Sequence, residues 1–289
     1  MRAAKNRGFT IVELLVVITI IGILMAMLFP ALNAARSTAR LAQCTNRQRS
    51  LGQGMQAYAL KKDLYPGWRN EIRPESGDSF DANWVVRILP NIEQANLYDK
   101  IRTTPAILTN DPSSASVDER LPRIDALICA ANPPEKRFDP VLSYVVNCGK
   151  PGDNDADRGT GLFFDRGKAV TTPVKIRPSF VSGADGTTNT LLMSESLHAK
   201  QWNNTGTNLS EAAVGLMWNQ TDTTSIGSLR DSDDDKNHLV PSGNHSGVIV
   251  MTFCDGHTRS ISENITRNVY KRMMTPDGGE MLSDDMLEP

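Results

Sequence analysis

Residues of the types that bind metal ions gather near the C-terminal end of the chain, at His245, Asp255 and His257. The Asp255-Gly256 pair predicts a two-residue hairpin turn in which both residues adopt positive φ. The preceding strand, 247–254, is then extended, and at ~3.3 Å per residue it separates His245 from Asp255 by about 30 Å. We therefore expect these two residues not to share a ligand. His245 is expected to cap or hydrogen-bond at the base of the strand.

Two acidic clusters are further candidates for binding a cation. The first places Asp153, Asp155 and Asp157 at alternate positions, as in a calcium-binding loop. It departs from the EF-hand pattern, because Arg158 stands where glycine is required and a phenylalanine stands where the bidentate glutamate is required. The second cluster is DSDDDK at 231–236. Calcium binding and a solvated acidic loop both stay open, and we expect no other cofactor.

A set of side chains suited to nucleophilic catalysis does not emerge. Ser194, Glu195 and Ser196 precede His198, but on a strand the two serines face away from the glutamate. The chain has no G-x-S-x-G nucleophile turn. We expect no enzymatic activity.

An apolar run from Phe9 to Phe29 is long enough to cross a membrane, since its 21 residues span about 30 Å as a helix. Basic residues at Arg2, Lys5 and Arg7 precede it, which predicts a cytoplasmic leader with the rest of the chain outside the cytoplasm. The run is too long for a secretory signal and ends without an A-x-A step. The formal net charge of −2 argues against nucleic-acid binding.

One acidic residue, Glu13, lies inside this run. A carboxylate in hydrocarbon costs about 2.5–3.5 kcal/mol on the insertion scale, and less near the end of the run. Glu13 therefore either extends to the membrane surface or pairs with a positively charged amine.

The N-terminal segment RGFTIVELLVVITIIGILMAMLFPAL resembles the start of type IV pilins and type II secretion pseudopilins. A basic leader ends in Gly8, Phe9 follows, Glu13 is then the fifth residue, and Pro30 lies where this family often has proline. The resemblance implies cleavage between Gly8 and Phe9 by prepilin peptidase and N-methylation of Phe9. It also implies that Glu13 pairs with the new amine of a neighbouring subunit. The implied partners are that peptidase, other pilin or pseudopilin subunits and the assembly platform of the bacterial inner membrane.

The rest of the chain resembles a group of prepilin-like proteins with a C-terminal domain of unknown function. The similar segments are 39–68, 83–101, 126–138, 185–196 and the H-x9-DG ending formed by His245, Asp255 and Gly256. Within 126–138, two alanines replace the Pro-Ser of the group. The positions of two of the four cysteines match those of the group, which points to a disulfide between Cys44 and Cys129. Cys254, at the hairpin tip, is expected to be free.

The element pattern predicts an α+β, pilin-like fold, with a long N-terminal helix packed on an antiparallel sheet. Apolar residues at helical spacing resume beyond Pro30, which favours a kink over a helix end. We expect the leader at 1–8, a membrane or filament-core helix at 9–29, its amphipathic continuation at 30–60, a head at 61–275 and a flexible tail at 276–289. Helical patterns lie at 83–101 and 264–273. Strand-like runs lie at 141–147, 160–165, 189–194, 214–218, 247–253 and 258–262, with the run at 248–253 central in the sheet and covered on both faces.

The expected function is that of a structural subunit, processed by prepilin peptidase and assembled into a type IV pilus or a type II secretion pseudopilus. The size of the head favours a minor or specialised subunit. The alternative is a membrane-tethered extracytoplasmic binding or adhesion module that never polymerises. In either case we expect a single-pass protein of the bacterial inner membrane, and in the first case a later place in a filament or at the cell surface.

Overall fold

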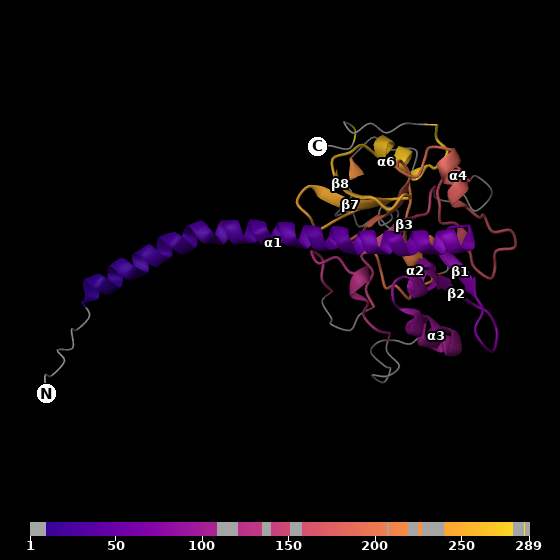
Figure 1. The fold of residues 1–289 in the computed structure, drawn as a ribbon, viewed down its shortest axis with the longest axis horizontal. Helices are drawn as coiled ribbons and strands as arrows, with labels where there is room; N and C mark the ends of the chain where they lie inside the picture. The colour runs from indigo at the N-terminus through magenta and orange to yellow at the C-terminus, as the bar shows by residue number, and fades with distance from the viewer. Residues whose placement is uncertain are drawn as a thin grey trace.

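The molecule consists of one long helix that projects far beyond a globular head (Figure 1). The computed structural model describes residues 10–108, 121–134, 140–150, 158–206, 208–218, 225–226, 240–279 and 286. Residues 1–8, Phe9 and the aspartates of 153–157 therefore lie outside the described residues.

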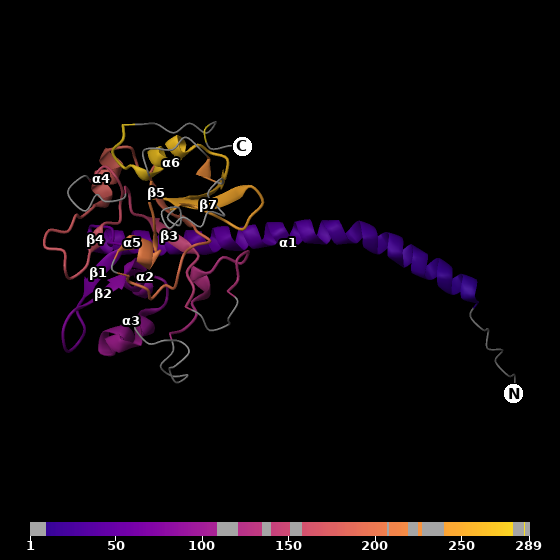
Figure 2. The same cartoon turned by 180° about the vertical axis from the view of Figure 1, so that it is seen from behind.

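Helix α1 (Ile11–Lys62) has 52 residues, which makes it about 78 Å long. It begins at the N-cap Thr10 and ends at Asp63, whose φ of 53° is left-handed. Lys61 and Lys62 in its last turn favour that end electrostatically. The helix continues through Pro30, as its apolar spacing predicted, and Figures 1 and 2 both show it curved.

The main sheet has five strands in the order β6-β3-β5-β7-β8. All neighbours are antiparallel except β3 and β6, which are parallel. The inner strand β7 is buried from its second residue onward, as expected for a strand covered on both faces. The bounds are β3 Tyr144–Asn147, β5 Leu191–Glu195, β6 Gly215–Leu216, β7 Val248–Phe253 and β8 Thr258–Ser262.

Two helices cover opposite sides of this sheet. The C-terminal half of α1 runs along one side and α6 (Arg267–Met274) lies on the other, as Figures 1 and 2 show from front and back. Helix α1 contributes a buried stripe at helical spacing: Cys44, Gln48, Leu51, Met55 and Tyr58. The apolar positions of the N-terminal half do not join this stripe, since every described residue before Leu41 is exposed. The head therefore holds α1 only from about Cys44 onward.

Gly52 sets how closely α1 approaches the sheet. A Cβ at this position would lie 2.8 Å from Cγ2 of Thr252 on β7. Glycine inside a helix costs roughly 1 kcal/mol relative to alanine. The close packing of helix on strand offsets that cost.

A second, three-stranded sheet was not expected. It pairs β1 (Arg69–Ile72) antiparallel with β2 (Phe80–Asn83) and parallel with β4 (Asp165–Arg166). Arg69 binds both carboxylate oxygens of Asp165 and joins the outer strand to the middle one. The predicted strand at 160–165 is therefore wrong in extent, because only its last residue enters β4.

The predicted helix over 83–101 is divided. Helix α2 (Trp84–Ile88) passes into the 3-10 turn η1 (Leu89–Asn91), and α3 (Ala95–Thr103) follows. Pro90 lies in η1, and Glu93 has a φ of 62°, so the α-helix cannot continue. The other short helices are η2 (Pro105–Leu108), η4 (Asp125–Leu127), α4 (Pro178–Gly183) and α5 (Leu209–Ala212).

Ordered contacts continue past the predicted end of the head at Thr275. Pro276 is buried, and its carbonyl accepts a hydrogen bond from the Asp185 backbone. The Asp185 carboxylate accepts hydrogen bonds from the amides of Gly278 and Gly279, at 2.7 and 2.9 Å. These contacts place the start of the expected tail within the head.

Candidate functional site

The N-terminal half of α1 carries an apolar surface whose exposure to water is unfavourable. Apart from Leu60 and Met286, every large hydrophobic side chain that the described residues expose lies between Ile11 and Leu32. These side chains are 43–84% exposed. Burying sixteen such groups at about 1 kcal/mol or more each would gain over ~15 kcal/mol. We call this segment, Ile11–Leu32, the apolar arm.

Helix α1, whose N-terminal part is the apolar arm, is the one helix among the described residues that is long and apolar enough to cross a membrane. Such a helix fits the single-pass, inner-membrane anchor expected from the sequence.

Glu13 stands at the start of the arm in a reciprocal cap with Thr10. Its carboxylate accepts hydrogen bonds from the Thr10 amide at 2.9 Å and the Thr10 hydroxyl at 2.8 Å. The Thr10 hydroxyl in turn accepts from the Glu13 amide at 3.2 Å. This T-x-x-E arrangement satisfies amides that the helix leaves without partners. Sequence reasoning missed this role, although the T-x-x-E spacing ahead of an apolar run is its usual signal.

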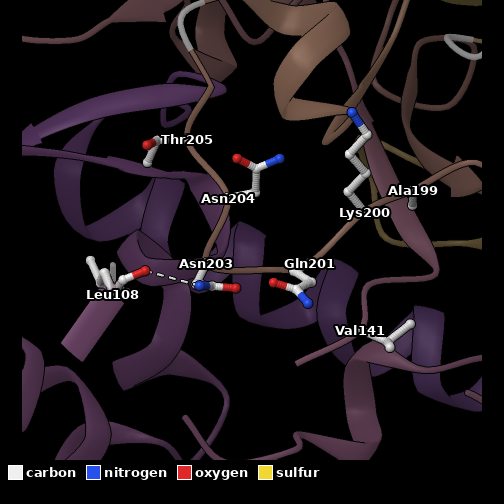
Figure 3. A pocket seen from close by; sticks show the side chains of 8 residues that line it. All are labelled: Leu108, Val141, Ala199, Lys200, Gln201, Asn203, Asn204 and Thr205. Atoms are coloured by element: carbon white, nitrogen blue, oxygen red, sulfur yellow. Dashed lines mark hydrogen bonds between the residues drawn. The ribbon is translucent and has the colours of Figure 1, made fainter. Parts of the chain in front are cut away.

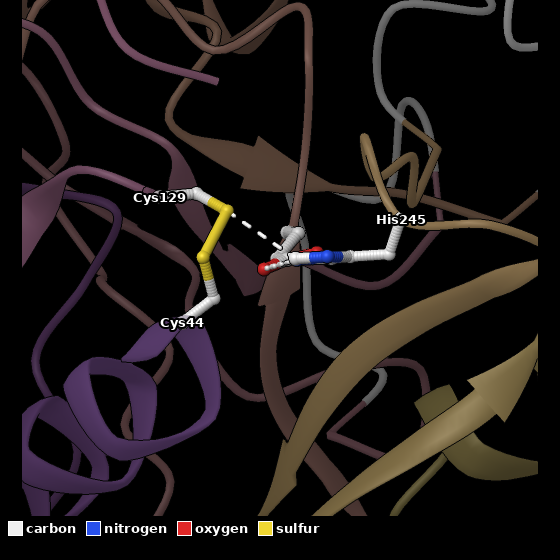
Figure 4. Close-up of side chains that lie close together, drawn as sticks. Cys44, Cys129 and His245 are labelled. Carbon is white, nitrogen blue, oxygen red and sulfur yellow. Dashed lines mark hydrogen bonds and ion pairs between the residues drawn. A yellow bond between two sulfur atoms is a disulfide. The ribbon is translucent and has the colours of Figure 1, made fainter. Parts of the chain in front are cut away.

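The second notable group lies where α1 enters the head. Cys44 of α1 and Cys129, just after η4, form a disulfide, which is the pair that the resemblance implied. Its Cα atoms are 5.1 Å apart, and it closes a separation of 85 residues. Figure 4 shows His245 directed at this disulfide, with its Nε2 3.4 Å from the Cys129 sulfur. The other two cysteines, Cys148 and Cys254, are free and buried.

Glu195 completes this group from the end of β5. Its Oε1 lies 3.3 Å from the same Nε2 of His245, and the two side chains are only 3% and 4% exposed. The other carboxylate oxygen, Oε2, is buried without a hydrogen-bond partner among the described residues. Sequence reasoning missed Glu195 as a partner of His245. The available signal was a carboxylate next to an apolar strand, because such a group needs a partner when it is buried.

The Asp255-Gly256 end of the motif has a different role. Only Gly256 has positive φ (86°), so the predicted two-residue turn is wrong. The Gly256 amide bonds the Phe253 carbonyl and the Phe253 amide bonds the His257 carbonyl, which makes a three-residue hairpin loop with glycine in the left-handed position. The Asp255 carboxylate fits this loop because it accepts from the His257 amide at 3.0 Å.

This turn lies against α1. The Gln56 side chain of α1 donates to the Cys254 carbonyl at 3.0 Å, and a Cβ at Gly256 would lie 2.8 Å from that side chain. His245 and Asp255 thus belong to separate contacts, as the sequence predicted. The Asp255-Gly256 end contacts α1 at Gln56, whereas His245 contacts Cys129 of the disulfide and Glu195.

The head also contains a pocket of about 560 Å³ (Figure 3). Its wall is rich in side-chain amides, and the amide of Asn203 donates to the Leu108 carbonyl at 2.9 Å. Such a wall suits a polar ligand. It is lined by Leu108, Val141, Ala199, Lys200, Gln201, Asn203, Asn204 and Thr205.

Comparison with known families separates the two parts of the chain. Residues 3–29 match the model of the prokaryotic N-terminal methylation motif. Residues 33–268 match the model described as a protein of unknown function, DUF1559. The chain belongs to this DUF1559 family. The family region begins near the end of the apolar arm and includes both ends of the His245–Gly256 motif.

Similarity to a curated protein lies with the pilins. A stretch of 78 residues is 32% identical to the type IV major pilin protein PilA of Myxococcus xanthus (strain DK1622). That stretch is 26% of this chain and 36% of the relative, so the chain spans about a third of the relative's length. No solved structure matches. Together with the methylation motif, this similarity makes the DUF1559 chain a type IV pilin-like protein.

Proposed function

We propose that the chain is a structural subunit that prepilin peptidase cleaves between Gly8 and Phe9 and that then assembles, through the apolar arm, into a type IV pilus or a type II secretion pseudopilus. The proposed role is structural and requires no catalytic step by this chain. The observation that carries the proposal is the apolar arm itself, which stands free of the head over Ile11–Leu32.

The arm needs an apolar environment before and after assembly. In the membrane, lipid covers its side chains. In a filament, the arms of other subunits replace lipid, so that transfer of the helix exchanges one apolar environment for another. The head does not obstruct this exchange, because its contacts with α1 begin only at Cys44.

Glu13 favours the transfer of the helix from the membrane to the filament. Cleavage after Gly8 creates a positive amine on Phe9, and Glu13 is the fourth residue after Phe9 in the sequence. In a low-dielectric environment an unpaired carboxylate is costly, and pairing with the Phe9 amine of a neighbouring subunit removes that cost. The hydrogen bonds from Thr10 hold the carboxylate at the end of the arm in the meantime.

The head supports a minor or specialised place in the filament. The DUF1559 region spans residues 33–268. Its two sheets and short helices form a bulky body at one end of α1 (Figure 1). A bulky head limits how closely subunits pack side by side. The 560 Å³ pocket is compatible with the alternative, a tethered module that binds a polar ligand without polymerising.

Crosslinking inside whole cells separates the two possibilities. A photoreactive residue in place of Leu24, which is 61% exposed on the arm, should yield a ladder of covalent oligomers in cells that carry prepilin peptidase. The same probe in a chain with Gly8→Val, which should escape cleavage, should yield monomers and at most dimers. Monomers alone from the cleaved chain would support the tethered module and contradict the proposal.

A further inference from the structure

The disulfide, His245 and Glu195 form a buried cluster that neither the pilin-like arm nor filament assembly uses. One ligand atom from each of Cys44, Cys129, Glu195 and His245 lies within 4.8 Å of all the others. All four residues are buried, and they come from α1, the segment after η4, the end of β5 and the loop before β7.

The geometry points to a second use of these four residues: we propose that the dithiol form of the chain binds one Zn²⁺ through the sulfurs of Cys44 and Cys129, the Nε2 of His245 and a carboxylate oxygen of Glu195. Disulfide and metal are then two alternative ways of joining α1 to the head. This inference does not depend on the proposed filament.

Two of the observed distances fit a tetrahedral zinc site, and the sulfurs, which are bonded to each other in the disulfide, would separate to about 3.8 Å around the ion. Zinc binds sulfur at about 2.3 Å, imidazole nitrogen at about 2.0–2.1 Å and carboxylate oxygen at about 2.0–2.2 Å. At the tetrahedral angle these bonds place nitrogen and oxygen about 3.4 Å apart, and sulfur and nitrogen about 3.5 Å apart. The corresponding separations from His245 Nε2 are 3.3 Å to Glu195 and 3.4 Å to Cys129.

The hydrogen bonds of the cluster leave polar atoms that a metal ion would bind. A single nitrogen, Nε2 of His245, faces both the Cys129 sulfur and a carboxylate oxygen of Glu195, so that three potential metal ligands meet at one place. The Oε2 of Glu195 is buried without a hydrogen-bond partner among the described residues, which is unfavourable for a carboxylate. A dication would satisfy the carboxylate and the imidazole together, and two thiolates and an imidazole are ligands that zinc prefers.

Backbone atoms lie close to the cluster on two sides. A Cβ at Gly243 would lie 2.8 Å from the Oε2 of Glu195, so a larger residue here would require this carboxylate to shift. The Ala130 amide donates to the Cys44 sulfur at 3.0 Å, which is the kind of contact that supports a thiolate.

Exchange between the two forms balances. A dithiol reductant gives two electrons and two protons to the disulfide and becomes a disulfide itself, and Zn²⁺ then displaces the two thiol protons. In the reverse direction a disulfide oxidant takes two electrons from the two thiolates and two protons from solvent. The Cys44–Cys129 bond forms and Zn²⁺ leaves. A chain that reaches the oxidising side of the membrane with free thiols would thus be held by zinc until the disulfide forms.

Cobalt titration of the full chain in detergent tests the site. The probe is Co²⁺, added anaerobically after reduction with a phosphine and removal of metals by a chelator. Alanine at both Cys148 and Cys254 leaves only the cluster thiols. This variant should bind one Co²⁺ with thiolate charge-transfer and tetrahedral visible bands, and Zn²⁺ should displace it. A disulfide oxidant should release one metal ion per chain.

Single variants identify the ligands. Loss of a residue that supports a metal ligand typically weakens metal binding by about 10–100-fold. His245→Gln and Glu195→Gln each remove a ligand, so each should weaken Co²⁺ binding by more than that. Cys44→Asp removes the disulfide without reduction, and this variant should bind Co²⁺ in non-reducing buffer with a weaker thiolate band. Absence of stoichiometric binding both by the reduced chain and by Cys44→Asp would overturn the proposal, as would unchanged affinity in His245→Gln.

Discussion

Glu13 and Thr10 cap the start of α1 reciprocally, with the carboxylate 2.9 Å from the Thr10 amide and 2.8 Å from its hydroxyl. Both described partners of the carboxylate belong to Thr10, and neither carries a charge. The acid that interrupts the apolar run therefore has a local role in forming the helix, and its charge remains to be paired. This distinction separates two kinds of variant, those that remove the cap and those that remove the charge.

Thr10→Val removes the cap and keeps the charge. The loss of an N-cap acceptor costs about 0.5–2 kcal/mol at the helix end. We expect the amide of Glu13 to exchange hydrogen about 2–30-fold faster than in the unaltered chain, while cleavage and filament yield change little. Hydrogen exchange of the chain in detergent, followed by mass spectrometry of N-terminal peptides, measures the first effect. Equal exchange in the two chains would show that the cap contributes nothing.

The Cys44–Cys129 disulfide should supply a large part of the stability of the head. A bridge across 85 residues is worth about 4–5 kcal/mol in the chain-entropy model. The double variant Cys44→Ser/Cys129→Ser should lower the free energy of unfolding by roughly that amount, in urea melts with chelator present. Reductant should lower the midpoint of the unaltered chain to that of the double variant. If reductant leaves the midpoint of the unaltered chain in place, the bridge does not stabilise the head.

Gly52→Ala should destabilise the head although alanine is the better helix former. The new Cβ would lie 2.8 Å from Cγ2 of Thr252, and overpacking of this kind costs about 1–3 kcal/mol. Thr252→Ser removes that methyl group and keeps the hydroxyl that contacts Thr258 at 2.9 Å. The double variant should therefore recover most of the loss, as a double-mutant cycle in urea would measure. Additive losses in the two single variants would contradict this packing.

The two buried thiols should make the head less stable in alkaline solution. Burial raises the pKa of Cys148 and of Cys254 in the folded chain, whereas an unfolded thiol has a pKa of about 8.5. Below that value both states keep the proton. Above it the unfolded state releases protons that the folded state keeps, so the free energy of unfolding falls by about 1.4 kcal/mol per pH unit for each thiol. Urea melts at pH 7 and pH 10 should show a smaller fall for Cys148→Ala/Cys254→Ala, and an equal fall would contradict the assignment.

The sequence predicted those parts of the fold whose signals are local and strong. The apolar run and the spacing beyond it predicted α1, including its continuation through Pro30. The continuous apolar pattern of 248–253 predicted an inner strand, and β7 is one. The disulfide followed from the resemblance, because four cysteines alone allow three full pairings.

The parts that sequence reasoning missed depend on contacts between distant segments. Strand β1 has no alternating apolar pattern, and it exists because Arg69 and Asn70 pair with β2 on one side and β4 on the other. The link between Glu195 and His245 joins positions 50 residues apart. The sequence around Glu195 and around His245 gives no sign that the two residues meet, so only the fold shows that both lie at the disulfide. The hairpin loop was misassigned because an Asp-Gly pair suits both the two-residue turn and the last two places of a three-residue loop.

The filament yield of Glu13→Gln decides whether the charge of Glu13 is needed for assembly. Glutamine keeps the capping box, because its amide oxygen accepts the same hydrogen bonds, and it removes the charge. We predict that this variant is cleaved after Gly8, as seen by intact mass, and that filaments sheared from cells fall at least about 10-fold, while Thr10→Val retains them. Filaments from Glu13→Gln at the level of the unaltered chain would contradict the proposed pairing of Glu13 with the amine of a neighbouring subunit.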